Sequence, residues 1–134
     1  MKKILFVLAF MGCLFLPNLS KAQCMMNQVL VNNSLSCPVE VTLYYSGCTP
    51  SSVGPTMIFG SGSQCITVPT GCTLTSMEVE DPTGGGDVTF SASGCVSRDD
   101  ENTSPGTNIC GHTTIGVSGC ATLPGGVIDI STGN

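Results

Sequence analysis

The chain has 134 residues, a length typical of one domain; nine are cysteines and tryptophan is absent. It carries four basic and nine acidic residues, a formal net charge of −5. This balance argues against nucleic acid and anionic membranes as partners, because both are bound mainly through lysine and arginine.

The first 22 residues are typical of a secretory signal peptide. Lys2 and Lys3 form a basic start, residues 4–16 are an apolar run of 13, and Ser20-Lys21-Ala22 places small residues at a cleavage site. A run of this length is too short for a transmembrane span of ~20 residues. We therefore expect residues 1–22 to be a cleaved leader, with no stable membrane insertion.

The Lys-Lys start and the Ala22-Gln23 junction resemble leaders of Gram-negative bacteria, Bacteroidota in particular. This resemblance covers only the leader and implies no function. Residues 10–13, Phe-Met-Gly-Cys, offer a lipobox as an alternative, but the apolar run continues beyond Cys13. We expect an exported bacterial protein located in the periplasm, at the cell surface or outside the cell.

Removal of the leader leaves Arg98 as the only basic residue against nine acidic ones, a net charge of −8, and it leaves eight cysteines. An even number of cysteines in a short exported chain is typical of a disulfide framework. No Cys-x-x-Cys spacing supports zinc instead. The expected disulfide cysteines are Cys24, Cys37, Cys48, Cys65, Cys72, Cys95, Cys110 and Cys120.

Short alternating runs, separated by Gly, Pro, Asn and Ser, predict strands and little helix. The clearest run is Val39 to Tyr45, whose odd-numbered residues are all apolar. The other predicted strands are residues 28–31, 65–68, 73–80, 88–92, 112–117 and 127–130, and residues 57–59 are either an eighth strand or a packed loop. We expect residues 23–134 to form one all-β domain, a small disulfide-stapled antiparallel sandwich or barrel of about seven or eight short strands. The runs at 28–31 and 127–130 are candidate edge strands for strand addition.

Strand length restricts the disulfide pairing. Cys37 and Cys48 flank the strand at 39–45, which spans ~30 Å when extended, whereas a disulfide needs α-carbons within ~7 Å. Each cysteine must therefore bond to a different segment, and Cys37, on the apolar face, is expected to form a bridge across the core. The same reach argues against a bond between Cys110 and Cys120.

Two pairings are predicted from loop closure. Cys65 and Cys72 flank a Pro-Thr-Gly turn closely enough to pair across a hairpin, and Cys95 with Cys110 would close the polar segment 98–108. That segment has no apolar residue, so it is either a solvated loop or a binding loop.

Clustered acidic residues suggest a calcium site, because calcium prefers carboxylate and carbonyl oxygens on flexible loops. No EF-hand pattern is present, and acids that only maintain solubility are the alternative. The candidate ligands are Glu78, Glu80, Asp81, Asp87, Asp99, Asp100 and Glu101.

Catalytic residues are scarce. His112 is the only histidine, and neither a nucleophile elbow nor a phosphate-binding glycine loop occurs. We expect no cofactor other than calcium and a non-catalytic binding or structural role, such as adhesion or surface assembly. The partner would be a protein, a surface glycan or another copy of the chain. The alternatives are an extracellular inhibitor or antibacterial factor that presents residues 98–108, a carboxylate-based hydrolase, and a calcium-dependent binding module.

Overall fold

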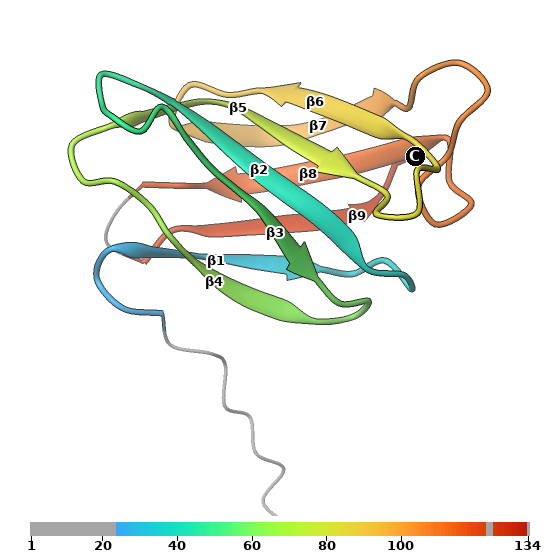
Figure 1. Ribbon diagram of the computed structural model, residues 1–134, viewed down its shortest axis with the longest axis horizontal. Helices are drawn as coiled ribbons and strands as arrows, with labels where there is room; N and C mark the ends of the chain where they lie inside the picture. Colours follow the sequence, from blue (N-terminus) through green and yellow to red (C-terminus); the bar gives the residue numbers. More distant parts are fainter. Residues whose placement is uncertain (1–23, 123–124, 134) are drawn as a thin grey trace, which may run out of the picture.

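A computed structural model describes residues 24–122 and 125–133, which form two facing β-sheets (Figure 1). The expected leader, residues 1–22, lies outside this range. One sheet has the order β4-β1-β9-β8-β7 and the other the order β3-β2-β5-β6. The strands are β1 (Gln28–Asn33), β2 (Val39–Ser46), β3 (Ser52–Ile58), β4 (Ser63–Thr67), β5 (Thr73–Glu80), β6 (Asp87–Ser91), β7 (Cys95–Asn102), β8 (Thr114–Cys120) and β9 (Val127–Thr132).

The sandwich predicted from the sequence is confirmed. All neighbouring strands pair antiparallel except β1 and β9, which run parallel, so the expected purely antiparallel pairing is wrong at this pair. Both of these strands lie inside the five-stranded sheet. They therefore offer no free edge for strand addition, and that prediction is wrong as well.

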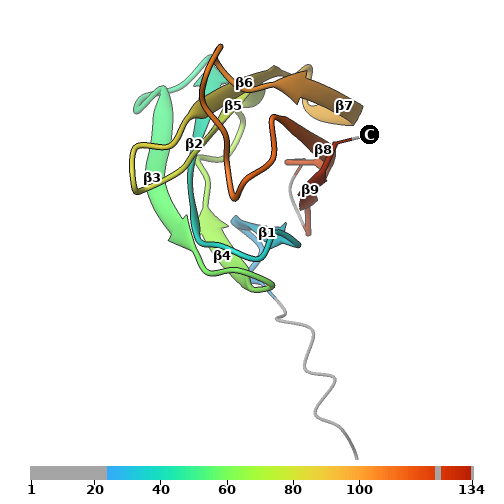
Figure 2. The ribbon, with the colours of Figure 1, turned by 90° about the vertical axis from the view of Figure 1, so that its right-hand side faces the viewer.

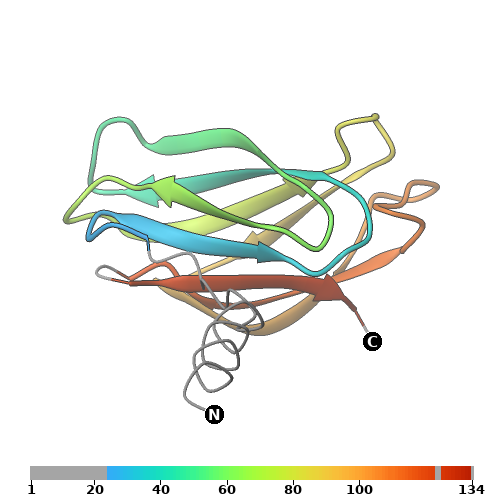
Figure 3. The same cartoon turned by 90° about the horizontal axis from the view of Figure 1, so that it is seen from below.

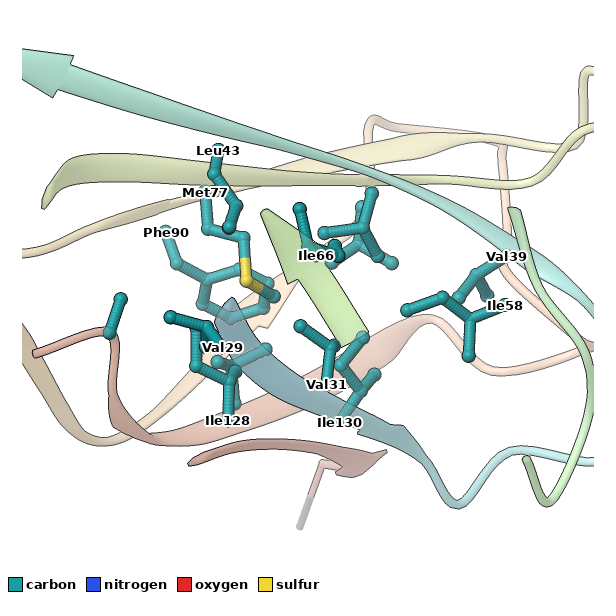
Figure 4. Close-up of a cluster of buried hydrophobic side chains, with 14 of the residues drawn as sticks. Val29, Val31, Val39, Leu43, Ile58, Ile66, Met77, Phe90, Ile128 and Ile130 are labelled. Carbon is teal, nitrogen blue, oxygen red and sulfur yellow. The ribbon is translucent and has the colours of Figure 1, made fainter. Parts of the chain in front are cut away.

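Alternating side chains build the core between the sheets. In β2 the residues Val39, Val41 and Leu43 are fully buried, and the polar residues between them face outward. Figure 4 shows side chains from both sheets meeting, Val29 and Ile128 on one side and Phe90 and Met77 on the other. Viewed end on, the strands surround this core, with β6 close to β7 and β3 close to β4 (Figure 2). These contacts fix the positions of the loops at the two ends of the sandwich.

One buried polar residue fixes the crossing between the sheets. Asn33 ends β1 and is 2 % exposed. Its Nδ2 donates to the carbonyl oxygens of Cys37 at 2.9 Å, and of Ile58 and Phe59 at 3.2 Å each, while its Oδ1 accepts from the backbone nitrogen of Leu35 at 3.0 Å. These backbone groups lie near the points where the chain passes between the sheets. The Asn33 side chain provides hydrogen bonds that strand pairing does not provide there.

Two strands at sheet edges go beyond the seven predicted, one of them the eighth strand expected as an alternative and the other not predicted. Met57 and Ile58 belong to strand β3 and not to a packed loop. This strand begins at Ser52, although it contains Gly54 and Pro55. β7 was not predicted, and it turns the first half of the supposed polar loop 98–108 into a strand. Proline and charged residues are tolerated at edges, where they discourage pairing with other chains. Alternation alone misses such strands.

All eight predicted cysteines form disulfides. The four bridges are Cys24–Cys65, Cys37–Cys110, Cys48–Cys72 and Cys95–Cys120. As expected, Cys37 and Cys48 bond to different segments and Cys110 does not bond to Cys120. The bridge from Cys37 joins the chain just before β2 to the segment before β8, and so links the two sheets.

Both loop-closure pairings are wrong. Cys65 does not pair with Cys72, because β4 and β5 belong to different sheets and the turn between them is a crossover, not a hairpin. Cys95 does not pair with Cys110, because β7 runs antiparallel to β8 and places Cys95 opposite Cys120. The sheet assignment therefore decides the connectivity.

Candidate functional site

A pocket of about 290 Å³ opens at the end of the sandwich where β2 ends and β5 begins. Four segments that are distant in the sequence meet there, close to the ends of β2, β4, β6 and β8. The lining residues are Tyr45, Val68, Pro69, Gly71, Cys72, Thr73, Leu74, Gly94, Ala121 and Thr122. They combine apolar surface with two threonine hydroxyls, and none carries a formal charge.

Hydrogen bonds hold the two sheets together beside the pocket. The backbone nitrogen of Gly94 donates to the carbonyl of Leu74 at 3.0 Å, and the carbonyl of Gly94 accepts from the nitrogen of Ala121 at 3.1 Å. Since Leu74 lies in β5 and Ala121 directly follows β8 of the other sheet, residue 94 ties the two sheets together at this end. Two disulfides at the same end join neighbouring strands within each sheet, Cys48–Cys72 between the end of β2 and the start of β5 and Cys95–Cys120 between β7 and β8. The pocket wall is therefore preorganised.

Tyr45 contributes to the pocket wall and has an unusual environment. It is 5 % exposed, and its hydroxyl oxygen is buried without a hydrogen-bond partner among the described residues. Burial raises the pKa of Tyr45 to about 12. The phenol therefore stays neutral, and the pocket stays uncharged at physiological pH.

A turn carrying two exposed methionines lies next to the pocket. Met25 and Met26 are 71 % and 81 % exposed. The turn is fixed by a bond from the Gln28 nitrogen to the Met25 carbonyl at 3.0 Å, and the Val68 nitrogen of the pocket lining donates to the Asn27 carbonyl at 2.9 Å. We call residues 25–27 together with the pocket lining the neutral end.

The opposite end of the four-stranded sheet is acidic. Strand register places Glu40, Glu80 and Asp87 side by side in one row across β2, β5 and β6. Burial and then repulsion from Glu78, Glu40 and Asp87 raise the pKa of Glu80 above its ordinary 4.5. We call this row, with the adjoining turn residue Asp81, the acidic end. In Figure 1 the β5–β6 turn lies on the right, and the loop between β4 and β5 lies on the left.

The acids predicted as calcium ligands are not all brought together. Glu78 accepts a hydrogen bond from the Tyr44 hydroxyl at 2.7 Å, which raises the pKa of Tyr44. Asp81 accepts from the Thr83 hydroxyl at 2.6 Å and from its backbone nitrogen at 2.8 Å, and these bonds hold the pKa of Asp81 below its ordinary value. Asp81 thus stabilises its own turn.

The remaining acids of the predicted site lie on another sheet. Glu101 is exposed on β7, and only the backbone is described for Asp99 and Asp100 of that strand. Among the residues whose side chains the structure describes, 24–95, 101–122 and 125–133, no group of three or more His, Cys, Asp or Glu could hold a metal ion. Calcium binding stays a prediction from the sequence.

The second half of the polar segment is a compact turn. Thr103 is 7 % exposed, and its hydroxyl lies within hydrogen-bond distance of the carbonyl oxygens of Thr107 and Thr113. Ser104 donates to Asp87 at 3.2 Å, which attaches the turn to the acidic end. Residues 98–108 therefore comprise the second half of β7 and a hydrogen-bonded turn, and they do not form one free loop. A free loop at this position was the basis for the alternative of an inhibitor that presents residues 98–108.

His112 lies in another tight turn. Its backbone nitrogen and carbonyl exchange hydrogen bonds of 2.9 Å with Ile109, so the predicted strand at 112–117 begins only at Thr114. The pocket lining contains no histidine and no carboxylate. Sequence reasoning missed the pocket, because no local pattern brings Tyr45, Leu74 and Ala121 together.

In the part of the chain that the structure describes, no helix is long and apolar enough to cross a membrane. Four disulfides in one small domain are consistent with an oxidising, extracellular or periplasmic location. A scan of protein-family models finds no match to the chain, and neither the curated proteins nor the solved structures contain a significant match.

Proposed function

We propose that this protein is a secreted, non-catalytic binding domain that acts at or outside the cell surface through its neutral end. The observation that carries the proposal is the separation of surface chemistry along the sandwich. An uncharged pocket and two exposed methionines lie at one end, and a row of three carboxylates lies at the other. The signal-peptide pattern of residues 1–22 supports secretion.

The pocket suits an uncharged, partly apolar group. Val68, Leu74 and Ala121 offer apolar contacts, and Thr73 and Thr122 offer hydroxyls. No fixed charge is present to bind an ion, and the volume lies near the lower limit of about 300 Å³ for small-molecule sites. A side chain from a partner polypeptide matches this size and chemistry better than a large ligand does.

A pair of matched variants tests the proposal. Thr73 and Thr89 are both exposed strand threonines, but Thr73 lines the pocket, whereas Thr89 pairs with Glu78, two residues along the strands from the row that contains Glu80 and Asp87. Labelled, oxidised protein is added to cells of the producing organism with its gene intact, and bound label is measured. We expect Thr73→Arg to reduce cell-surface binding at least tenfold, because it places a charge at the pocket, and Thr89→Arg to leave it unchanged.

The opposite pattern would contradict the proposal. If Thr89→Arg abolishes binding and Thr73→Arg does not, the acidic end is the functional surface. Loss in both variants with intact folding would also count against the neutral end, as would no specific binding by the wild-type protein.

A further inference from the structure

The neutral end carries a hollow and a protrusion side by side. The pocket is the hollow, and the exposed side chains of Met25 and Met26 form the protrusion. The bond from Val68 to Asn27 and the disulfide Cys24–Cys65 fix the turn relative to the pocket. Figure 3 shows the turn before β1 and the connection after β4 at the same end of the sandwich.

Such an arrangement is self-complementary. In a two-fold contact the same patch is used by both copies, so the protrusion of each copy meets the hollow of the other. Methionine suits this contact, because its flexible thioether chain adapts to irregular apolar hollows. The apolar lining that it would meet consists of partly exposed Pro69 together with Val68, Leu74 and Ala121, which are at most 8 % exposed.

The distribution of charge favours the same contact. Expected cleavage leaves each copy with a net charge of −8, so two copies repel each other at most orientations. A contact through the neutral ends keeps the two rows of Glu40, Glu80 and Asp87 far apart. Their repulsion is then screened, because the Debye length is only about 8 Å at physiological salt.

A second exposed apolar group, at the end of β3, favours the contact less. Phe59 is 71 % exposed and follows β3, in which Met57 lies opposite Glu40 of the acidic row. Its insertion into the pocket of another copy would bring an acidic end against the neutral end and would form an open chain. This contact lacks the charge separation of the two-fold arrangement.

We propose that the partner of the neutral end is a second copy of this chain, with Met25 and Met26 of each copy packed against the pocket of the other about a two-fold axis. This inference rests on the proposed function, since it names the partner for the same surface. The assembly closes at two copies.

Light scattering coupled to size-exclusion chromatography tests the inference on the exported, oxidised protein over a range of concentrations. We expect dimers that persist at high salt, because the contact is apolar. Met26→Glu and Thr73→Arg should each weaken association at least tenfold, since each places a charge in both contacts of the dimer. Thr89→Arg makes the same change of charge next to Glu78, away from the neutral end, and should leave association unchanged.

A mixture of the two single variants gives the sharper test. In a mixed dimer one contact pairs the new carboxylate with the new guanidinium, and the other contact is wild type. Mixing should therefore restore dimers that neither variant forms alone. Monomers at all concentrations, open chains of growing mass, or no recovery on mixing would overturn the inference. If the protein is monomeric while Thr73→Arg still abolishes cell-surface binding, the second copy is the wrong partner and the proposed function stands.

Discussion

Glu40 on β2 and Glu80 on β5 lie directly opposite each other, and Asp87 on β6 continues the same row. Like charges opposite one another destabilise a sheet by about 0.2–1 kcal/mol per pair. The cost is near the lower value for exposed pairs, because solvent and salt screen the repulsion. We predict that Glu80→Gln raises the melting temperature at pH 7. The matched change Glu101→Gln, at an exposed acid on β7, should have little effect. Equal changes in the two variants would contradict a specific effect of the row.

The same residue predicts a pH dependence. The pKa of Glu80 is raised, so between pH 7 and its ordinary pKa of 4.5 the folded state binds more protons than the unfolded state. Stability should therefore increase as the pH falls through the folded pKa toward 4.5, and Glu80→Gln should reduce this increase. Thermal unfolding at a series of pH values measures it. The lowered pKa of Asp81 acts in the opposite sense, with stability lost only as the pH falls below 3.8.

Asn33 should be the most sensitive polar position of the fold. Asn33→Ala removes the partners of several backbone groups, including the buried Ile58 carbonyl, and an unsatisfied buried group costs about 1–3 kcal/mol. We expect a loss of about 3 kcal/mol in chemical denaturation. Asn32→Ala is the control, because its bond to Asp129 is exposed, and it should cost less than about 1 kcal/mol. Similar costs for both would refute the role of Asn33.

Removal of two different disulfides should affect stability and binding in opposite orders. In the chain-entropy relation, the Cys37–Cys110 bridge over 73 residues is worth about 4 kcal/mol and the Cys48–Cys72 bridge over 24 residues about 3 kcal/mol. We predict that double alanine replacement of Cys37 and Cys110 costs more stability but preserves cell-surface binding. Replacement of Cys48 and Cys72 should cost less stability and impair binding, because Cys72 lines the pocket. Unfolding and binding assays on both variants check this reversal.

Tyrosine titration tests the packing beside the pocket. The protein has two tyrosines, and both have a raised pKa, Tyr45 through burial to about 12 and Tyr44 first through its bond to Glu78. In the folded protein, tyrosinate absorbance at pH 10 should therefore be lower than in the reduced, unfolded chain, which is half ionised at that pH. Half-ionisation at pH 10 in the folded protein would show that Tyr45 is not enclosed.

The sequence could predict the strands that build the core but not those at the edges. The alternation in Val39 to Tyr45 identified β2, and residues 73–80 match β5 at both ends, because one face of each strand is buried. β7 was missed, because an edge strand rich in charge shows no such alternation. The wrong disulfide pairs have a different cause. Local turn patterns cannot show that β4 and β5 belong to different sheets.

The candidate site was less predictable than the fold. The acidic residues predicted as calcium ligands are distributed over two sheets and their turns, whereas the pocket is built from uncharged residues of four segments. Only tertiary packing brings such residues together. The exposure of Met25 and Met26 is likewise a property of the fold, because a pair of methionines in a sequence is as compatible with a core as with a surface.

Methyl NMR of labelled methionines measures directly whether two copies of the chain associate through their neutral ends. Met25 and Met26 lie at that end, Met57 is exposed next to the acidic row, and Met77 is fully buried. With rising concentration of the oxidised protein, we expect the Met25 and Met26 signals to shift together while those of Met57 and Met77 stay fixed. A shift of Met57 with Met25 and Met26 unchanged would contradict this expectation.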